Sequence, residues 1–142
     1  MGSGGLIQQN VIPRALVCTD HEALAASLCP LLAGHGFLTD WTALPHLGTE
    51  PPLQPWCDVA LFDVDLPGLN QAFIQRLRFG HPYLYTAMVV GWWDIREEEF
   101  RSAADFVLHM PVRAEPVADL AADFLRRWSR RRRALPAASR VA

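Results

Sequence analysis

Five short runs along the chain have the composition of β-strands. Four of them are almost wholly apolar, which is typical of strands that are covered by other elements on both faces. The run from Phe37 to Leu44 also contains Thr39, Asp40 and Thr42, and this polarity predicts a strand at the edge of a sheet. The five predicted strands are Ala15–Cys18, Phe37–Leu44, Asp58–Phe62, Thr86–Val90 and Phe106–Leu108.

Apolar residues at helical spacing occupy the segments between the strands. A first stripe predicts a helix that stops at Gly34 and Gly36, with a kink or an early end at Pro30. A second stripe predicts a helix that ends at Gly80. The two stripes consist of Leu24, Leu28, Leu31 and Leu32, and of Leu69, Phe73, Ile74 and Leu77.

Two more helices are predicted in the second half of the chain. Asp94 and Glu97 have the spacing of a capping box, so a helix should begin there and run to about Ala104. The last helix has the longest stripe, and Pro116 lies in its first turn, where proline is tolerated. Its stripe consists of Val117, Leu120, Ala121, Phe124, Leu125 and Trp128.

The segment 45–56 contains four prolines, which argue against a regular helix between the second and third strands. We therefore expect the second helix to be shortened or lost. The remaining alternation of strands and helices predicts an α/β domain with a parallel sheet and helices on both faces. The 142 residues fit one domain, which we place at residues 12–128. Residues 1–11 are then a flexible leader, and residues 129–142 are a C-terminal tail.

Composition argues against several classes of protein. No apolar run approaches the roughly 20 residues that a membrane span needs. The three cysteines, Cys18, Cys29 and Cys57, have no CxxC spacing, which favours reduced thiols in a cytoplasmic protein over disulfides or a zinc site. The chain has neither a glycine-rich phosphate loop nor a nucleophile elbow, so we expect a non-enzymatic protein without an organic cofactor.

The charge is unevenly distributed along the chain. All 13 basic residues are arginines, and lysine is absent. Residues 1–125 carry six arginines and all 15 acids, whereas residues 126–142 carry seven arginines and no acid. An arginine-rich tail can bind nucleic acid. Trp128 is the one aromatic residue in this segment, so stacking on bases is not indicated, and nucleic-acid binding ranks last among our hypotheses.

Polar residues follow three of the predicted strands. They are Asp20 after the first strand, Asp63 and Asp65 after the third, and His109 after the fifth. Sites in open α/β sheets form at the carboxyl ends of the strands. Two carboxylates at neighbouring strand ends can hold Mg²⁺, and the ion offsets the repulsion when a carboxylate accepts a phosphoryl group. Asp20 and Asp63 are therefore candidate magnesium ligands.

The segment Asp58–Gly68 resembles the third-strand motif of bacterial response-regulator receiver domains. In that family a hydrophobic strand ends in the phosphoacceptor aspartate, and a proline follows four residues later; Asp63 and Pro67 match these positions. Thr19 and Asp20 fall on the family's acidic pair, and the order of elements matches from about Ile12 to Trp128. The resemblance implies a flavodoxin-like (βα)5 three-layer sandwich with strand order 2-1-3-4-5.

Four positions depart from the receiver pattern and identify the chain as a degenerate member, or pseudo-receiver. Thr19 replaces one acid, Gly91 replaces the family's hydroxyl residue, and Trp92 replaces the small residue after it. Met110 stands before Pro111, where the family has a lysine, and the chain has no lysine to supply from elsewhere. Arginine is no simple substitute for a compact ammonium group. The magnesium site at Asp20 and Asp63 is therefore expected to be vestigial.

Three functional hypotheses follow. The leading one is a phosphorylation-independent signalling or scaffold module that acts through protein contacts in two-component-type signalling. The resemblance implies a contact surface, for a partner or a homodimer, on the fourth helix, fifth strand and last helix. The alternatives are a slow phosphoacceptor that uses Asp63 with Mg²⁺, and a nucleic-acid-associated module that uses the tail. Candidate contact residues are Trp93, Phe100, Phe124 and Trp128.

Overall fold

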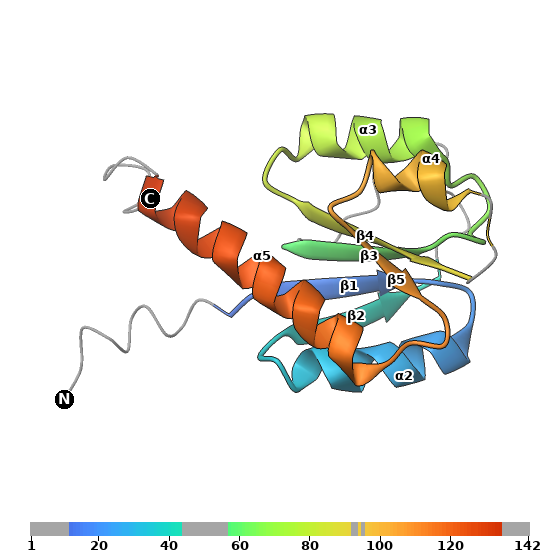
Figure 1. Cartoon of the computed structure of the whole chain (residues 1–142), viewed down its shortest axis with the longest axis horizontal. Helices are drawn as coiled ribbons and strands as arrows, with labels where there is room; N and C mark the ends of the chain where they lie inside the picture. Colours follow the sequence, from blue (N-terminus) through green and yellow to red (C-terminus); the bar gives the residue numbers. More distant parts are fainter. Residues whose placement is uncertain (1–11, 44–56, 92–93, 95, 135–142) are drawn as a thin grey trace.

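Five parallel strands form one sheet in the order β2-β1-β3-β4-β5, in a computed structural model that describes residues 12–43, 57–91, 94 and 96–134. This confirms the predicted flavodoxin-like fold and strand order (Figure 1). The strands are β1 (Arg14–Cys18), β2 (Leu38–Thr42), β3 (Val59–Asp63), β4 (Tyr85–Val90) and β5 (Phe106–His109). The helices are α2 (Glu22–Ala33), α3 (Gln71–Gly80), α4 (Glu97–Arg101) and α5 (Ala114–Ala134). The proline-rich segment, on which the predicted loss of a helix falls, lies outside the described residues.

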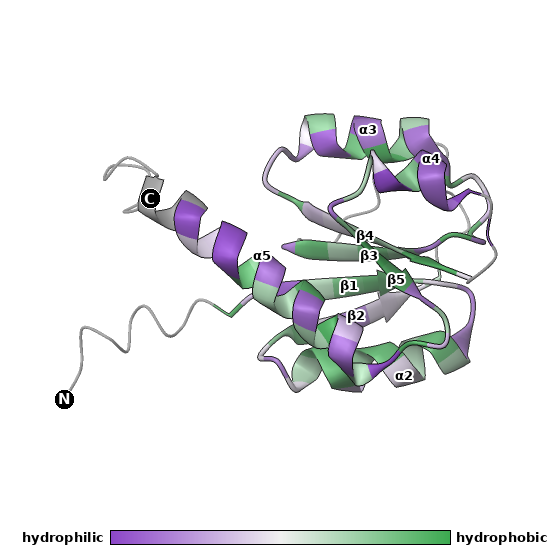
Figure 2. Ribbon diagram, in the orientation of Figure 1, coloured by the Kyte–Doolittle hydropathy of each residue, from purple (hydrophilic) through white to green (hydrophobic). Residues whose placement is uncertain are grey.

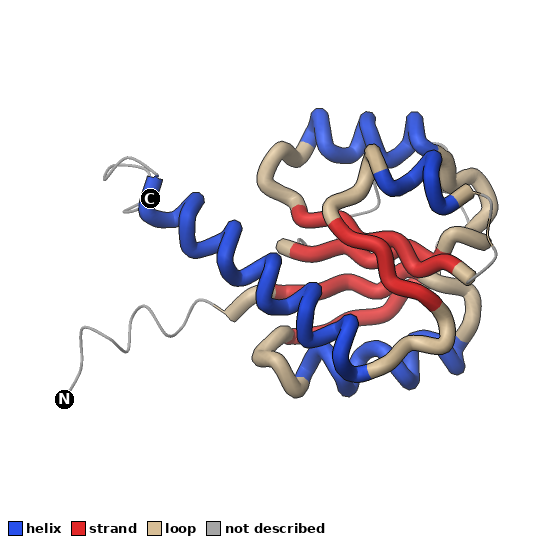
Figure 3. The backbone as a smooth tube through the Cα atoms, viewed as in Figure 1, coloured by secondary structure: helices blue, strands red, loops and turns tan. Residues whose placement is uncertain are grey.

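The sheet separates two apolar cores, one on each face. In β1, Ala15 and Val17 face α2 and α5, whereas Leu16 and Cys18 face α3 and α4. The faces alternate because successive side chains of a strand point in opposite directions. β3 and β4 are buried along their whole length, which explains their almost uninterrupted apolar sequences. Figure 3 shows the strands between the two layers of helices, and Figure 2 shows their apolar character.

The edge position of β2 agrees with its polar sequence. β2 pairs only with β1 among the described strands, and its residues Leu38, Asp40 and Trp41 are exposed. β5 forms the other edge of the sheet and pairs with β4. Within the part of the chain that the structure describes, no helix is long and apolar enough to cross a membrane.

Two helix bounds differ from those predicted. α2 passes through Pro30 and ends at Ala33 with Gly34 as its C-cap, so the predicted stop at Gly34 is confirmed and an early end at Pro30 is wrong. The helix continues because Leu28 and Leu32 are fully buried against the sheet. α4 begins at Glu97 rather than at Asp94, and it ends at Arg101. The capping box does not form, because the Asp94 carboxylate accepts hydrogen bonds from Arg96 instead.

The last helix is longer than its apolar stripe. α5 begins at Ala114 and continues past Trp128 to Ala134, so the first six residues of the predicted tail are helical. Its first half packs on the sheet through Val117, Leu120 and Phe124. Its second half extends beyond the end of the sheet at which the strands begin (Figure 1).

Candidate functional site

The carboxyl ends of β1 and β3 bring Thr19 and Asp63 together. The register pairs Cys18 with Phe62, so Thr19 and Asp63 follow one step later on neighbouring strands. The Thr19 hydroxyl donates a hydrogen bond of 2.7 Å to Oδ2 of Asp63. Thr19 is 0% exposed and Asp63 is 2% exposed, so this bond lies away from water.

Both oxygens of the Asp63 carboxylate have partners. Oδ1 accepts a hydrogen bond of 3.0 Å from the backbone N–H of Asp65, as an aspartate does when it caps a turn. Oδ2 also lies 3.9 Å from Nε2 of His21. No buried side-chain nitrogen or oxygen in the described part of the chain lacks a hydrogen-bond partner. The buried carboxylate is therefore tolerated, because its hydrogen bonds replace those it made to water.

Thr19 is itself fixed from three directions. Its hydroxyl accepts a hydrogen bond from the backbone N–H of His21, and its backbone N–H donates to the carbonyl of Thr42. The indole Nε1 of Trp41 donates to the Thr19 carbonyl at 2.8 Å. From the sequence, Thr19 was predicted only as a missing acid, and His21 and Trp41 were not singled out. The bond from His21 is a local turn that the two-residue spacing could have indicated, whereas no spacing rule indicates the bond from Trp41, which comes from a different strand.

The resemblance to receiver domains implies a magnesium ion at this place in the fold. The residues of this chain do not fit such an ion. Thr19 provides a neutral hydroxyl where a second carboxylate would bind, and that hydroxyl donates to the Asp63 oxygen. Asp20 is exposed. Among the described residues, no three His, Cys, Asp or Glu side chains are grouped so that they could hold a metal ion. Magnesium prefers several oxygen ligands in octahedral geometry, and this site does not supply them.

Two further departures from the receiver pattern lie at the ends of β4 and β5. Gly91 follows β4, and a Cβ atom added there would meet no atom within 4 Å. Met110 follows β5, its backbone N–H donates to the carbonyl of Val90, and its side chain packs against the core beneath α2 and α5. A thioether is uncharged, so it cannot pair with a phosphoryl group. Trp92 and Trp93 lie outside the described residues, and their roles stay predictions.

Arg96 links two loops at the carboxyl edge of the sheet, and we call this group the Arg96 clamp (Arg96, Asp65, Asp94). Its guanidinium donates to Asp65 at 2.8 Å and to both carboxylate oxygens of Asp94, at 2.8 and 2.6 Å. It also donates to the carbonyl of Val64. The hydrogen bond from Arg96 lowers the pKa of Asp94, and its two carboxylate partners raise the pKa of Arg96. No pattern in the sequence predicted this clamp.

A second polar link joins α4 to the end of β5. Nε2 of His109 lies 2.8 Å from Oε1 of Glu97, and Arg101 pairs with the same glutamate one helical turn later. The Arg96 clamp therefore joins Asp94 to the turn after β3, and the Glu97–His109 contact fixes the start of α4. His109 was singled out in the sequence as a polar strand end, and the structure places its side chain against Glu97.

Two of the predicted contact residues are wrong. Phe100 is 1% exposed beneath α4, and Phe124 is 2% exposed between α5 and the sheet, so neither can contact a partner. Trp128 is half-buried and stacks on Phe124 with 5.5 Å between ring centroids. These aromatic residues fill the core because each lies on the inward face of its helix. Leu125, on the outward face of α5, is exposed and was not selected.

Comparison of the whole fold identifies its class. No protein-family model and no curated protein matches the sequence. A receiver domain protein (CheY-like) from Methanospirillum hungatei matches with a TM-score of 0.66 and 19% identity, over 84% of this chain and 99% of the other. The receiver domain of the response regulator TorR matches with a TM-score of 0.68 and 20% identity, over 81% and 98%.

A longer protein matches as well. NtrX from Brucella abortus has a TM-score of 0.71 and 18% identity, over 87% of this chain but only 28% of its own length. These identities are low, so the similarity concerns the arrangement of the backbone rather than individual residues. The strand order, the two helical layers and these neighbours together show that the chain has the fold of a response-regulator receiver domain.

Proposed function

We propose that this chain is a receiver-like signalling or scaffold module of two-component-type signalling that works in the cytoplasm without phosphorylation. The observation that carries the proposal is the burial of Asp63, whose two oxygens accept hydrogen bonds from Thr19 and Asp65. A phosphoryl donor must reach one of these oxygens. Phosphorylation would break the bond from Thr19 and place a dianion in a buried site without a paired cation.

The groups that would stabilise a phosphorylated Asp63 are also missing. Met110 provides no ammonium group, and Gly91 provides no hydroxyl. A hydrogen bond to a charged group contributes about 1.5–3 kcal/mol. Two such losses disfavour the phosphorylated state by a factor of about a hundred or more. Phosphorylation would then be too weak to control the domain, so its output has to depend on protein contacts.

The face formed by α4, β5 and α5 is the contact surface that we propose, either for a partner protein or for a second copy of the chain. A hollow of about 230 Å³ lies on this face, between α4 and β5. Its lining combines charged and apolar groups, as protein interfaces do. The lining residues are Arg101, Ala104, Asp105, Phe106 and Val107.

The phosphorylation claim is tested by incubating the protein with acetyl phosphate and Mg²⁺ and measuring the intact mass. We expect no phosphorylated species of the wild type, because the carboxylate is inaccessible, and none of the Asp63→Asn variant. A stoichiometric addition of one phosphoryl group to the wild type, absent from Asp63→Asn, would overturn the proposal and establish Asp63 as a phosphoacceptor.

The contact surface is tested by charge reversal in the lining of the hollow. Arg101→Glu should weaken self-association, measured as molar mass by light scattering over a range of concentrations. Arg76→Glu, on the exposed face of α3, changes the net charge equally and serves as the matched control. Equal effects of the two substitutions would contradict the proposed surface.

A further inference from the structure

Among the described residues, the most exposed aromatic side chains lie in the last turn of α3 and in the turn that leads from it to β4. Phe79 is 91% exposed and Tyr83 is 63% exposed, whereas the other exposed large hydrophobic residues in the described part of the chain are at most 47% exposed. A Cβ atom added at the intervening Gly80 would meet no atom within 4 Å, so open space surrounds this turn. The turn is therefore a convex apolar projection, and burial of these rings against another surface would be favourable.

Arginines of α3, α5 and β1 lie at the end of the sheet at which this turn leads into β4. Arg78 of α3 and Arg127 of α5 both bind Oδ1 of Asp105, at 3.2 and 2.9 Å, so this carboxylate links the two helical layers at the start of β5. Arg127 also marks the point at which α5 passes the end of the sheet, because Asp105 directly precedes β5. We call this region the basic end: Arg14, Arg76, Arg78, Arg126, Arg127 and Arg130.

The basic end keeps a positive charge after the acids within it are counted. Among the described residues, Asp105 and Asp123 bind Arg78, Arg126 and Arg127. Asp58 is a third acid here, and its carboxylate accepts a hydrogen bond from the backbone N–H of Arg14. Arg76 and Arg130 are exposed, and α5 continues through three further arginines at 131–133. The arginine-rich turns of α5 extend past the sheet on the same side as the α3–β4 turn (Figure 1).

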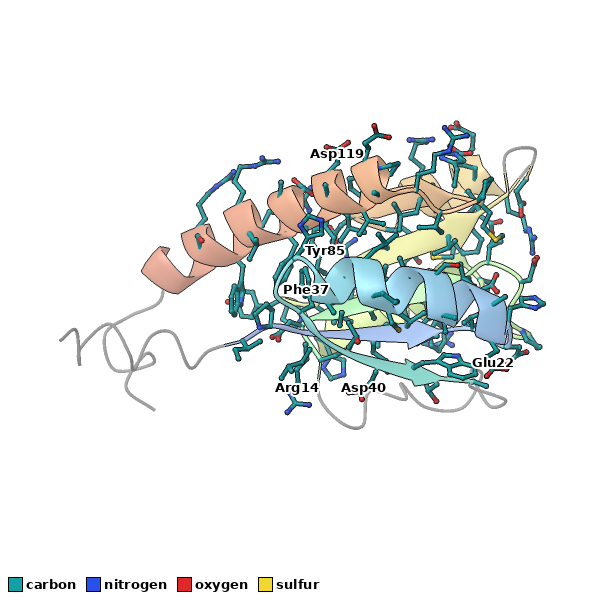
Figure 4. The ribbon with its side chains drawn as sticks, turned by 90° about the horizontal axis from the view of Figure 1, so that it is seen from below. Arg14, Glu22, Phe37, Asp40, Tyr85 and Asp119 are labelled. Carbon is teal, nitrogen blue, oxygen red and sulfur yellow. The ribbon has the colours of Figure 1, made fainter. Side chains whose placement is uncertain are left out.

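Many of the acidic residues lie at the opposite end of the molecule. Glu22 begins α2 and Glu97, Glu98 and Glu99 begin α4, near the carboxyl ends of the strands. Figure 4 shows Arg14 and Glu22 at opposite ends of β1. A strand of five residues spans about 16 Å. This exceeds the screening length of about 8 Å at physiological salt, so the acids do not cancel the attraction of the basic end for an anionic surface.

We infer that the basic end docks on an anionic lipid surface, with Phe79 and Tyr83 inserted among the headgroups. A convex apolar turn fits a fluid interface without needing a matching pocket, and aromatic rings are favoured at the level of the headgroups. Arginine side chains lay their apolar stems along such a surface and keep the charge in water. Anionic lipids attract each basic residue near the surface with about 1 kcal/mol, or about fivefold in affinity. This docking is independent of the proposed function at Asp63.

The test is sedimentation of the full-length protein with vesicles of phosphatidylcholine, with and without phosphatidylglycerol. We expect binding only to the anionic vesicles, and binding that weakens as salt is raised. Phe79→Ser should reduce the binding several-fold without unfolding the protein, because this side chain is 91% exposed. Arg130→Glu should reduce it at least fivefold.

The matched control is Arg113→Glu, which changes the net charge equally at an exposed position near the carboxyl ends of the strands. It should leave vesicle binding within twofold of the wild type. Failure of the wild type to bind anionic vesicles at low salt would overturn the inference, as would equal losses in Arg113→Glu and Arg130→Glu. Binding to duplex DNA but not to vesicles, with Phe79→Ser unaffected, would assign the basic end to nucleic acid instead.

Discussion

Replacing Thr19 with valine removes one hydroxyl from the centre of the proposed structural site and keeps the shape of the side chain. The hydroxyl donates to Oδ2 of Asp63 at 2.7 Å, and both residues are buried. Without it, a carboxylate that is 2% exposed keeps the backbone N–H of Asp65 and the distant His21 ring as partners. The substitution therefore removes a hydrogen-bond donor from a buried carboxylate, which is destabilising.

The expected loss is about 2–3 kcal/mol in the free energy of unfolding, because the lost bond involves a charged acceptor. For a domain of this size that corresponds to a fall in Tm of about 6–12 °C. Urea unfolding followed by circular dichroism measures the loss. Thr42→Val, on the edge strand β2, is the matched control and should change the stability by less than about 0.5 kcal/mol.

Repeating the Thr19→Val substitution in a second variant, Asp63→Leu, shows whether its effect depends on the Thr19–Asp63 bond. In an Asp63→Leu protein the buried charge beside Thr19 is removed, so Thr19→Val should cost less than about 1 kcal/mol there. A phosphoacceptor pocket kept open for chemistry would behave differently, because active-site groups often reduce stability. A neutral or stabilising effect of Thr19→Val in the wild-type background would refute the view that Asp63 is a satisfied structural residue.

Three further outcomes are expected. Asp123→Asn should reduce stability at neutral pH and make stability fall less steeply in acid. Burial raises the pKa of Asp123, but the Tyr85 hydrogen bond and the two arginines beside it lower the pKa overall. The stability that Asp123 contributes is therefore present above its unfolded pKa and is lost as pH falls through its folded pKa. Urea unfolding as a function of pH checks this, and an unchanged slope would contradict it. Phe100→Ala should cost about 3–5 kcal/mol in unfolding free energy by creating a core cavity, and a loss below about 1 kcal/mol would contradict its burial. Arg96→Gln should cost about 1 kcal/mol or less, because the guanidinium is partly exposed, but should raise hydrogen exchange in the loop before α4.

The fold could be predicted because each strand and helix has a recognisable pattern in its own short stretch of sequence. Uninterrupted apolar runs identify strands buried on both faces, and helical stripes identify the segments between them. The position of Asp63 also follows from the sequence, since it ends the most apolar run and precedes a turn with Pro67 and Gly68. Gly68 has a φ of 84°, a backbone conformation that glycine adopts without strain.

The site could not be predicted in full, because its contacts join residues that are distant in the sequence. The Thr19–Asp63 bond and the Arg96–Asp65 bond each span more than 30 positions and depend on strand register and loop path. The mistaken selection of Phe100 and Phe124 has a related cause. A helical stripe shows which residues share a face, but not whether the sheet or a partner covers that face.

The most direct test of the central claim is an NMR titration of the folded protein with beryllofluoride and Mg²⁺, which together imitate a phosphorylated aspartate. The account predicts no change in the backbone amide signals around Thr19, Asp63 and Met110, because the Asp63 carboxylate is buried and the residues do not fit a magnesium ion. Saturable shifts of these signals, with further shifts in α4 and β5, would contradict it and show that Asp63 still operates a phosphorylation switch.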